Sequence, residues 1–106
     1  MIEYGVKAVF LLPFHDNDGR DLTAEIIEVQ TQLWTMFTAF SKEGQVEGVY
    51  QMADGSRVVD VNEKYSIHFD ESQLVELEKI LRDFKGKTLQ EKIYLEINRG
   101  VELRLI

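Results

Sequence analysis

Glu63, His68 and His15 are the side chains of this 106-residue chain whose types could support acid–base chemistry. Glu63 interrupts an alternating apolar pattern, so it would point inward from a strand. Burial disfavours the charged form of a carboxyl group and raises its pKa, which would make Glu63 a general acid or base. A bulge that turns Glu63 outward, or a Lys or Arg partner, would remove that role.

His68 falls on the opposite, more polar face of the same strand, where Ser66 and Tyr94 could join it in proton transfer. His15 could take part only if the fold brings its loop to that face. The alternative is that both histidines are simply exposed, one on a strand and one in a loop. No Ser-His-Asp set or G-x-S-x-G element surrounds any serine.

The densest polar cluster lies at residues 15–21, with Asp16, Asp18 and Asp21 as candidate metal ligands. Carboxylate oxygens at this density could hold Ca²⁺ or Mg²⁺. The spacing does not fit an EF-hand loop, because Arg20 falls where a ligand is needed. An acidic turn before a helix explains the same residues without a metal, and we favour that explanation.

Apolar periodicity predicts the elements that must position these side chains. A strand near Tyr4–Leu12 carries apolar residues on both faces, which indicates a central strand. Spacings of three and four then predict a helix that starts at Asp21 or Thr23 and ends near Ser41. On that helix Ile27 and Trp34 widen the apolar stripe, and we expect them to pack on a neighbouring helix rather than form a partner-binding ridge.

A hairpin follows, with strands at Gln45–Met52 and Arg57–Phe69 and an Asp54-Gly55 pair typical of a two-residue type I′ turn. We expect a bulge or bend near Asn62-Glu63. Asp70 and Gln73 form a capping-box pattern at the start of a second helix. A strand at Lys92–Ile97 comes next, and the alternation after Gly100 indicates either its bulged continuation or an extra C-terminal strand.

This order predicts one α+β domain over residues 1–106, a ferredoxin-like β-α-β-β-α-β sandwich. Right-handed crossovers place both helices on one face of an antiparallel sheet, with the first and third strands central. The other, helix-free face would expose Val9, Leu11 and Tyr94. We expect these three residues to form an interface with a second copy or with a protein partner.

Composition narrows the classes of function. The net charge of −7 argues against nucleic-acid and membrane partners, because phosphate backbones and anionic lipids are repelled. Without cysteine the chain has no disulfide or thiolate ligand. No glycine-rich nucleotide motif is present, so we expect no cofactor. The N-terminus lacks a signal-peptide pattern, and a cytoplasmic protein is the expectation.

The stretch Gly48-Val49-Tyr50, followed by Gly55, Glu63 and Ser66, resembles a pattern in small uncharacterised bacterial proteins with a β-α-β-β-α-β core. The resemblance implies the same fold. That group has no assigned activity, so it implies nothing about function.

Two hypotheses about function remain. The first is a non-catalytic interaction or regulatory module that self-associates through its open sheet face, which the missing catalytic motifs favour. The alternative is a small acid–base enzyme with a cleft between that face and the loop after the first strand, using Glu63 or His68. The first predicts a dimer, and the second predicts a deep pocket.

Overall fold

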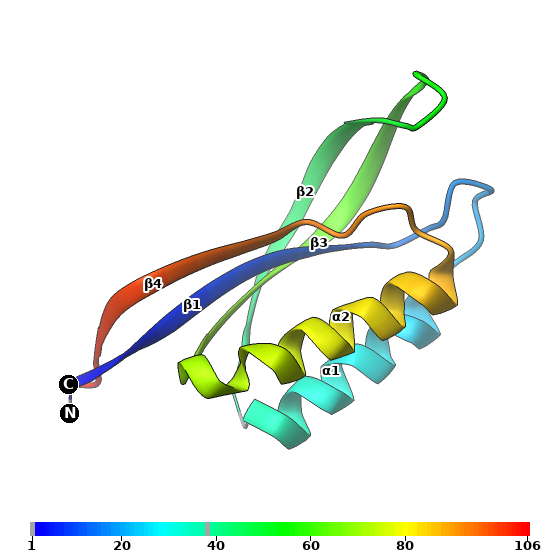
Figure 1. Ribbon diagram of the computed structural model, residues 1–106. Helices are drawn as coiled ribbons and strands as arrows, with labels where there is room; N and C mark the ends of the chain where they lie inside the picture. Colours follow the sequence, from blue (N-terminus) through cyan, green and yellow to red (C-terminus); the bar gives the residue numbers. More distant parts are fainter. Residues whose placement is uncertain (1, 38) are drawn as a thin grey trace.

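The computed structural model describes residues 2–37 and 39–106, which form two layers (Figure 1). The elements follow in the order β1, α1, β2, β3, a short 3₁₀ turn, α2 and β4. Their bounds are β1 Ile2–Pro13, α1 Thr23–Phe37, β2 Ser41–Gln51, β3 Arg57–Phe69, the 3₁₀ turn Glu71–Gln73, α2 Leu74–Thr88 and β4 Leu95–Arg104.

The four strands form one antiparallel sheet in the order β2-β3-β1-β4. Both helices lie on the same face of this sheet (Figure 1). The β-α-β-β-α-β arrangement and the central positions of β1 and β3 confirm the predicted ferredoxin-like fold. The apolar character of both faces of β1 gave the correct signal for a central strand.

The core lies between the helices and the inward face of the sheet. Alternate residues of β1, among them Phe10 and Leu12, are fully buried against the apolar stripes of α1 and α2. Phe10 stacks on Tyr65 of β3, with ring centroids 5.2 Å apart. Ile27 and Trp34 lie outside this core, at 55% and 66% exposure. Our expectation that they pack on a neighbouring helix is therefore wrong, because Ile26, Val29 and Leu33 form the buried side of α1.

The β2–β3 hairpin extends beyond the helix layer (Figure 1). Near Tyr65 the inward face of the hairpin is covered by the helices. Closer to the hairpin turn, the same face has no helix against it. Val49, Val59 and Val61 sit on that outer part and are 63%, 58% and 45% exposed. The alternation correctly placed the valines of β3 on the inward face, but the lengths of the helices leave them uncovered.

Several boundaries differ from the sequence prediction, including the last strand, which begins at Leu95 rather than at Lys92. Helix α1 ends at Phe37, and β2 begins at Ser41, four residues earlier than expected. The bulge expected near Asn62-Glu63 lies in the partner strand, between Lys42 and Gln45, where Gly44 has φ +98°. Positive φ suits glycine, which lacks a Cβ.

The hairpin turn has three residues rather than two, because the amide of Met52 donates to the carbonyl of Ser56 at 2.8 Å. Gly55 has a positive φ and Asp54 does not, so the type I′ prediction is wrong. The segment after Gly100 continues β4 across a register shift against β1 at Gly5/Val6. The bulged continuation is therefore correct, and no separate C-terminal strand forms.

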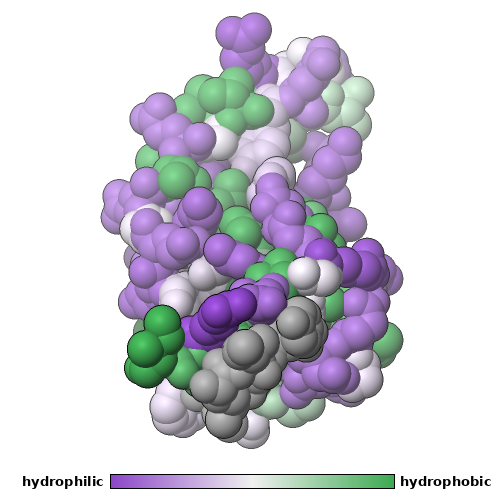
Figure 2. All heavy atoms as spheres, turned by 90° about the vertical axis from the view of Figure 1, so that its left-hand side faces the viewer, coloured by the Kyte–Doolittle hydropathy of each residue, from purple (hydrophilic) through white to green (hydrophobic). Residues whose placement is uncertain are grey.

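The described helices include none long and apolar enough to cross a membrane. The face shown in Figure 2 is mostly hydrophilic, with apolar side chains in small separate groups. This distribution matches the high content of acidic residues.

Candidate functional site

A cavity of about 550 Å³ lies on the helix-free side of the sheet. The projecting hairpin lines one side of it, and residues 90–94 between α2 and β4 line the other. Leu11 and Pro13 at the end of β1, with Asn17 in the following loop, complete the lining. The hairpin and the α2–β4 connection thus form two walls, and the end of β1 lies between them.

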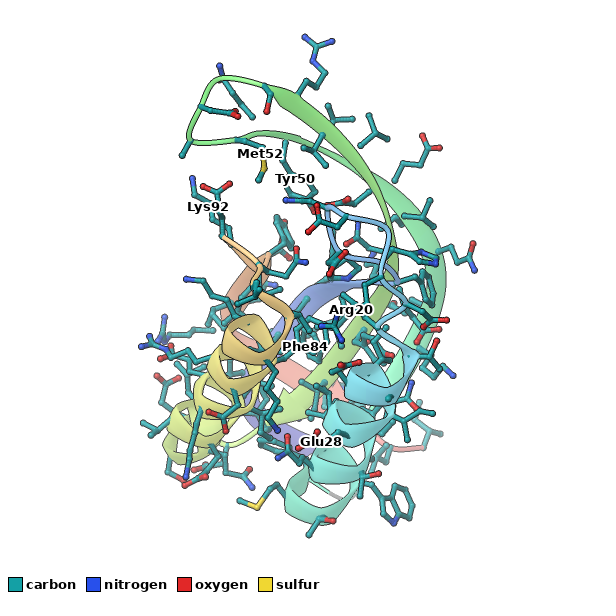
Figure 3. The ribbon with its side chains drawn as sticks, turned by 90° about the vertical axis from the view of Figure 1, so that its right-hand side faces the viewer. Arg20, Glu28, Tyr50, Met52, Phe84 and Lys92 are labelled. Atoms are coloured by element: carbon teal, nitrogen blue, oxygen red, sulfur yellow. The ribbon has the colours of Figure 1, made fainter. Side chains whose placement is uncertain are left out.

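Tyr50 and Met52 reach from β2 and its turn toward the side where Lys92 lies (Figure 3). On the wall opposite the hairpin, the backbone carbonyl of Tyr94 accepts a hydrogen bond from the amide of Leu11 at 3.3 Å. This bond joins the segment before β4 to β1. The Tyr94 hydroxyl donates to Glu96 at 3.1 Å. Aromatic side chains therefore stand on both walls.

Gly48 determines where the Tyr50 ring lies. A Cβ at Gly48 would collide with the Tyr50 hydroxyl oxygen and would fall 2.7 Å from two carbons of its ring. Real Cβ atoms do not approach other atoms so closely, so any larger residue at position 48 would push the ring away. The spacing of Gly48 and Tyr50 on one strand face thus sets the shape of the hairpin wall.

Asn62 and Asp60 supply the polar groups next to Tyr50. Asn62 is 2% exposed, and its side-chain amide donates to the Asp60 carbonyl at 3.2 Å. Burial and the nearby Asp60 raise the pKa of Tyr50, while a hydrogen bond from Asn62 opposes that shift. Burial also raises the pKa of the Asp60 carboxyl. At neutral pH the Tyr50 hydroxyl therefore stays protonated and can donate a hydrogen bond to a ligand.

Glu63 lies on the helix side of the sheet and does not line the cavity. Its carboxylate accepts the Tyr65 hydroxyl and, at 3.4 Å, the side-chain amide of Gln30 from α1. The Lys42 ammonium is 3.9 Å away. The inward direction inferred from the alternation is thus present, and so is a lysine partner, Lys42. The bulge lies in β2 and does not turn Glu63 outward.

His68 lies on the open face at the other end of β3, beside Gly5. Its Nε2 atom is buried and has no hydrogen-bond partner in the described part of the chain. His15 forms an isolated bridge with Asp21 in the loop after β1. Neither histidine lines the cavity, and the fold places Ser66 and Tyr94 on the open face without bringing His15 to them.

Two of the three aspartates proposed as metal ligands, Asp16 and Asp21, bond to neighbouring residues of the same segment. Asp16 accepts the backbone amides of Asp18 and Arg20 and pairs with the Arg20 guanidinium, and these bonds lower its pKa. Asp21 accepts the amide of Thr23 at 2.7 Å at the start of α1. Within residues 2–37 and 39–106, no group of three His, Asp or Glu side chains is arranged to hold a metal ion.

Of the three expected interface residues, Leu11 and Tyr94 line the cavity and Val9 lies nearer the middle of the open face. The cavity is also lined by residues that the sequence analysis did not propose for a site, above all Tyr50, Asp60 and Asn62. One feature of the sequence could have indicated this part of the site. Asn62 is a polar residue in a central strand, and a buried amide requires partners.

No protein-family model and no curated protein matches the sequence. Solved structures do match its fold. A phage SAM lyase in complex with S-methyl-5'-thioadenosine aligns with a TM-score of 0.68 and 16% identity, over 94% of this chain and 85% of that one. CutA from Synechococcus elongatus PCC7942 aligns with a TM-score of 0.60 and 6% identity, over 97% and 85%. At these identities the likeness establishes the ferredoxin-like fold alone.

Proposed function

We propose that this protein binds a small, phosphate-free ligand with an aromatic base in the cavity of its open sheet face. The observation that carries the proposal is the cavity itself, whose volume of about 550 Å³ is in the range of small-molecule sites. Its walls combine aromatic and aliphatic side chains with a few fixed polar groups, which is the usual make-up of such sites.

The polar groups suit the edge of a heterocyclic base. Tyr50 offers a hydroxyl donor, and the Asp60 carboxylate offers acceptors beside it. Asn62 is held by the Asp60 carbonyl, so its orientation is fixed before a ligand arrives. Fixed groups lose less entropy on binding than mobile ones.

Charge argues against a phosphorylated ligand. The lining side chains that carry full charges at neutral pH are Asp60, Glu91 and Lys92, two acids and one base. They belong to a chain with a net charge of −7. A neutral or cationic nucleoside avoids the repulsion that phosphate would meet. The matched phage SAM lyase holds S-methyl-5'-thioadenosine, a compound without phosphate, and we take this compound as the first ligand to test.

Titration calorimetry tests the proposal with S-methyl-5'-thioadenosine and adenosine, and with ATP as the phosphorylated comparison. We expect saturable heat with the first two compounds and weaker binding of ATP. Gly48→Ala should weaken binding about tenfold or more, because the displaced Tyr50 ring enters the ligand space. Gly86→Ala is the matched control, since a Cβ at Gly86 meets nothing within 4 Å. A flat titration with both nucleosides would contradict the proposal.

Self-association through Val9, Leu11 and Tyr94 is a second proposal for the same face. Tyr94 is 46% exposed, which leaves apolar surface available there. Light scattering should then show a dimer that Leu11→Lys disrupts, and a strict monomer at high concentration argues against it. We do not extend either proposal to acid–base catalysis, because Glu63, His68 and His15 all lie outside the cavity.

A further inference from the structure

The sheet has two outer strands, β2 and β4, and neither pairs with another strand along its outer side within the described residues. Unpaired strand edges carry rows of backbone donors and acceptors that can pair with another chain. On the helix-facing side, the surface beside β2 is apolar with one acid, whereas the surface beside β4 is a groove with basic side chains.

Beside β2 lies an apolar surface with one acid, which we call the hairpin surface: Glu47, Val49, Val59 and Val61. Their pairing places all four on the same side of the sheet, Glu47 opposite Val61 and Val49 opposite Val59. The valines are 45–63% exposed because the helices end before the hairpin does (Figure 1). A contiguous group of exposed valines is unusual for a strand surface left in water.

Beside β4 lies a groove of about 560 Å³ between the strand and helix α2. We call it the groove surface. Leu81, Ile93 and Leu95 supply its apolar part. Arg82, Lys85 and Lys92 supply positive charge. Arg82 pairs with Glu78 at 3.4 Å, whereas Lys85 and Lys92 form no ion pair with any described residue.

We propose that the hairpin surface of one copy docks on the groove surface of a second copy, with β2 of the first alongside β4 of the second. A sheet continued in this way places the helix-facing side of β2 next to the helix-facing side of β4. The valines then cover Ile93 and Leu95, which are only partly buried in the single chain, and Glu47 approaches the unpaired lysines. The apolar contacts and the opposite charges both favour this arrangement of the two copies.

The two surfaces are different, so the contact is head-to-tail, and each copy has both halves of it. Such contacts close into rings when the rotation between copies allows it. Val49, Lys92 and Ile93 also line the open-face cavity, whereas Glu47, Val59 and Lys85 lie outside it, so variants at these last three positions test the contact separately from the proposed ligand.

Light scattering on the whole chain is the first test. The wild-type protein should have a mass of at least twice 12.3 kDa, and Val59→Asp should reduce it to 12.3 kDa. Val75→Asp is the matched control, because Val75 on α2 is 71% exposed and belongs to neither surface. Thermal unfolding confirms that each variant folds. A wild-type monomer, or an assembly that survives Val59→Asp, would overturn the proposal.

Cross-linking provides a second test that does not depend on disrupting the contact. The natural chain has no cysteine, so Glu47→Cys and Lys85→Cys each introduce a single thiol. With a short bis-maleimide, a mixture of the two variants should give a cross-linked dimer, and neither variant alone should do so. Glu47→Cys mixed with Glu76→Cys, on an exposed position of α2, is the control. Cross-linking of either variant alone to the same extent would show a symmetric contact and contradict the proposal.

Discussion

Leu89 ends helix α2 in a left-handed backbone conformation, with φ 56°, and its side chain is 87% exposed. A left-handed conformation in a residue with a Cβ destabilises the folded state by about 1–2 kcal/mol. Glycine avoids this strain but loses about 0.5–1 kcal/mol more chain entropy on folding. We expect Leu89→Gly to raise the free energy of unfolding by about 0.5–1 kcal/mol in urea denaturation. Leu89→Ala is the control, since it keeps the strain, and an equal gain from alanine would contradict the backbone explanation.

Tyr65 is fully buried, and its hydroxyl donates to Glu63 and accepts from Gln30 at 2.8 Å. Burial and the Glu63 carboxylate raise the pKa of Tyr65 above its usual value near 10. The folded state therefore favours the protonated phenol. This contribution is fully present below pH 10 and is lost as the pH rises through the folded-state pKa.

Tyr65→Phe removes the donor and leaves Glu63 with fewer partners. We expect a loss of about 1–2 kcal/mol at pH 7, measured by urea denaturation. The variant should also lose less stability than the wild type between neutral and strongly alkaline pH. Tyr94→Phe, at a half-exposed position just before β4, should change stability little at pH 7. Identical alkaline profiles for wild type and Tyr65→Phe would rule out Tyr65 as the titrating group.

Among the elements, the predicted Asp70 cap forms on the 3₁₀ turn Glu71–Gln73, and α2 follows directly at Leu74 without a side-chain cap of its own. Asp70 accepts the amide of Ser72 at 3.1 Å, and Gln73 accepts the amide of Asp70 at 3.1 Å. The capping box is thus confirmed. Local hydrogen-bonding patterns of this kind are visible in the sequence because donor and acceptor lie within three residues.

The hydrogen bonds from Ser72 lower the pKa of Asp70 in the folded protein. A lowered carboxyl pKa contributes stability that is present above the unfolded value near 4 and is lost as the pH falls through the folded value. Asp70→Ala should therefore lower the unfolding midpoint at pH 7 and have a smaller effect near pH 2. Asp83→Ala, on the exposed side of α2, is the matched control. An Asp70→Ala effect that does not change with pH would contradict the capping role.

At the scale of the whole molecule, the proposed head-to-tail contact predicts a concentration-dependent unfolding temperature. Association stabilises the folded state by mass action, so wild-type protein should unfold at a higher temperature as its concentration rises. Val59→Asp should remove the dependence, and Val75→Asp should retain it. A wild-type melting temperature that stays constant over a hundredfold dilution would argue against the assembly.

The element order, the central position of β1, the inward side of β3 and the Asp70 cap could all be predicted from the sequence. Each depends on alternation or on spacings within one element, which the chain carries locally. The sequence-based prediction misjudged the end of α1, the hairpin turn and the placement of Trp34, because packing partners and turn hydrogen bonds decide these.

The place of a possible site, in contrast, follows only from the packing of the elements in three dimensions. The acid–base candidates Glu63 and His68 are on opposite faces of one strand, and neither reaches the cavity. The cavity exists because the hairpin projects beyond the helices and faces the α2–β4 connection, some thirty to forty residues away in the sequence. Contacts between segments so far apart leave no periodic trace in the sequence, whereas strand alternation and helix caps do.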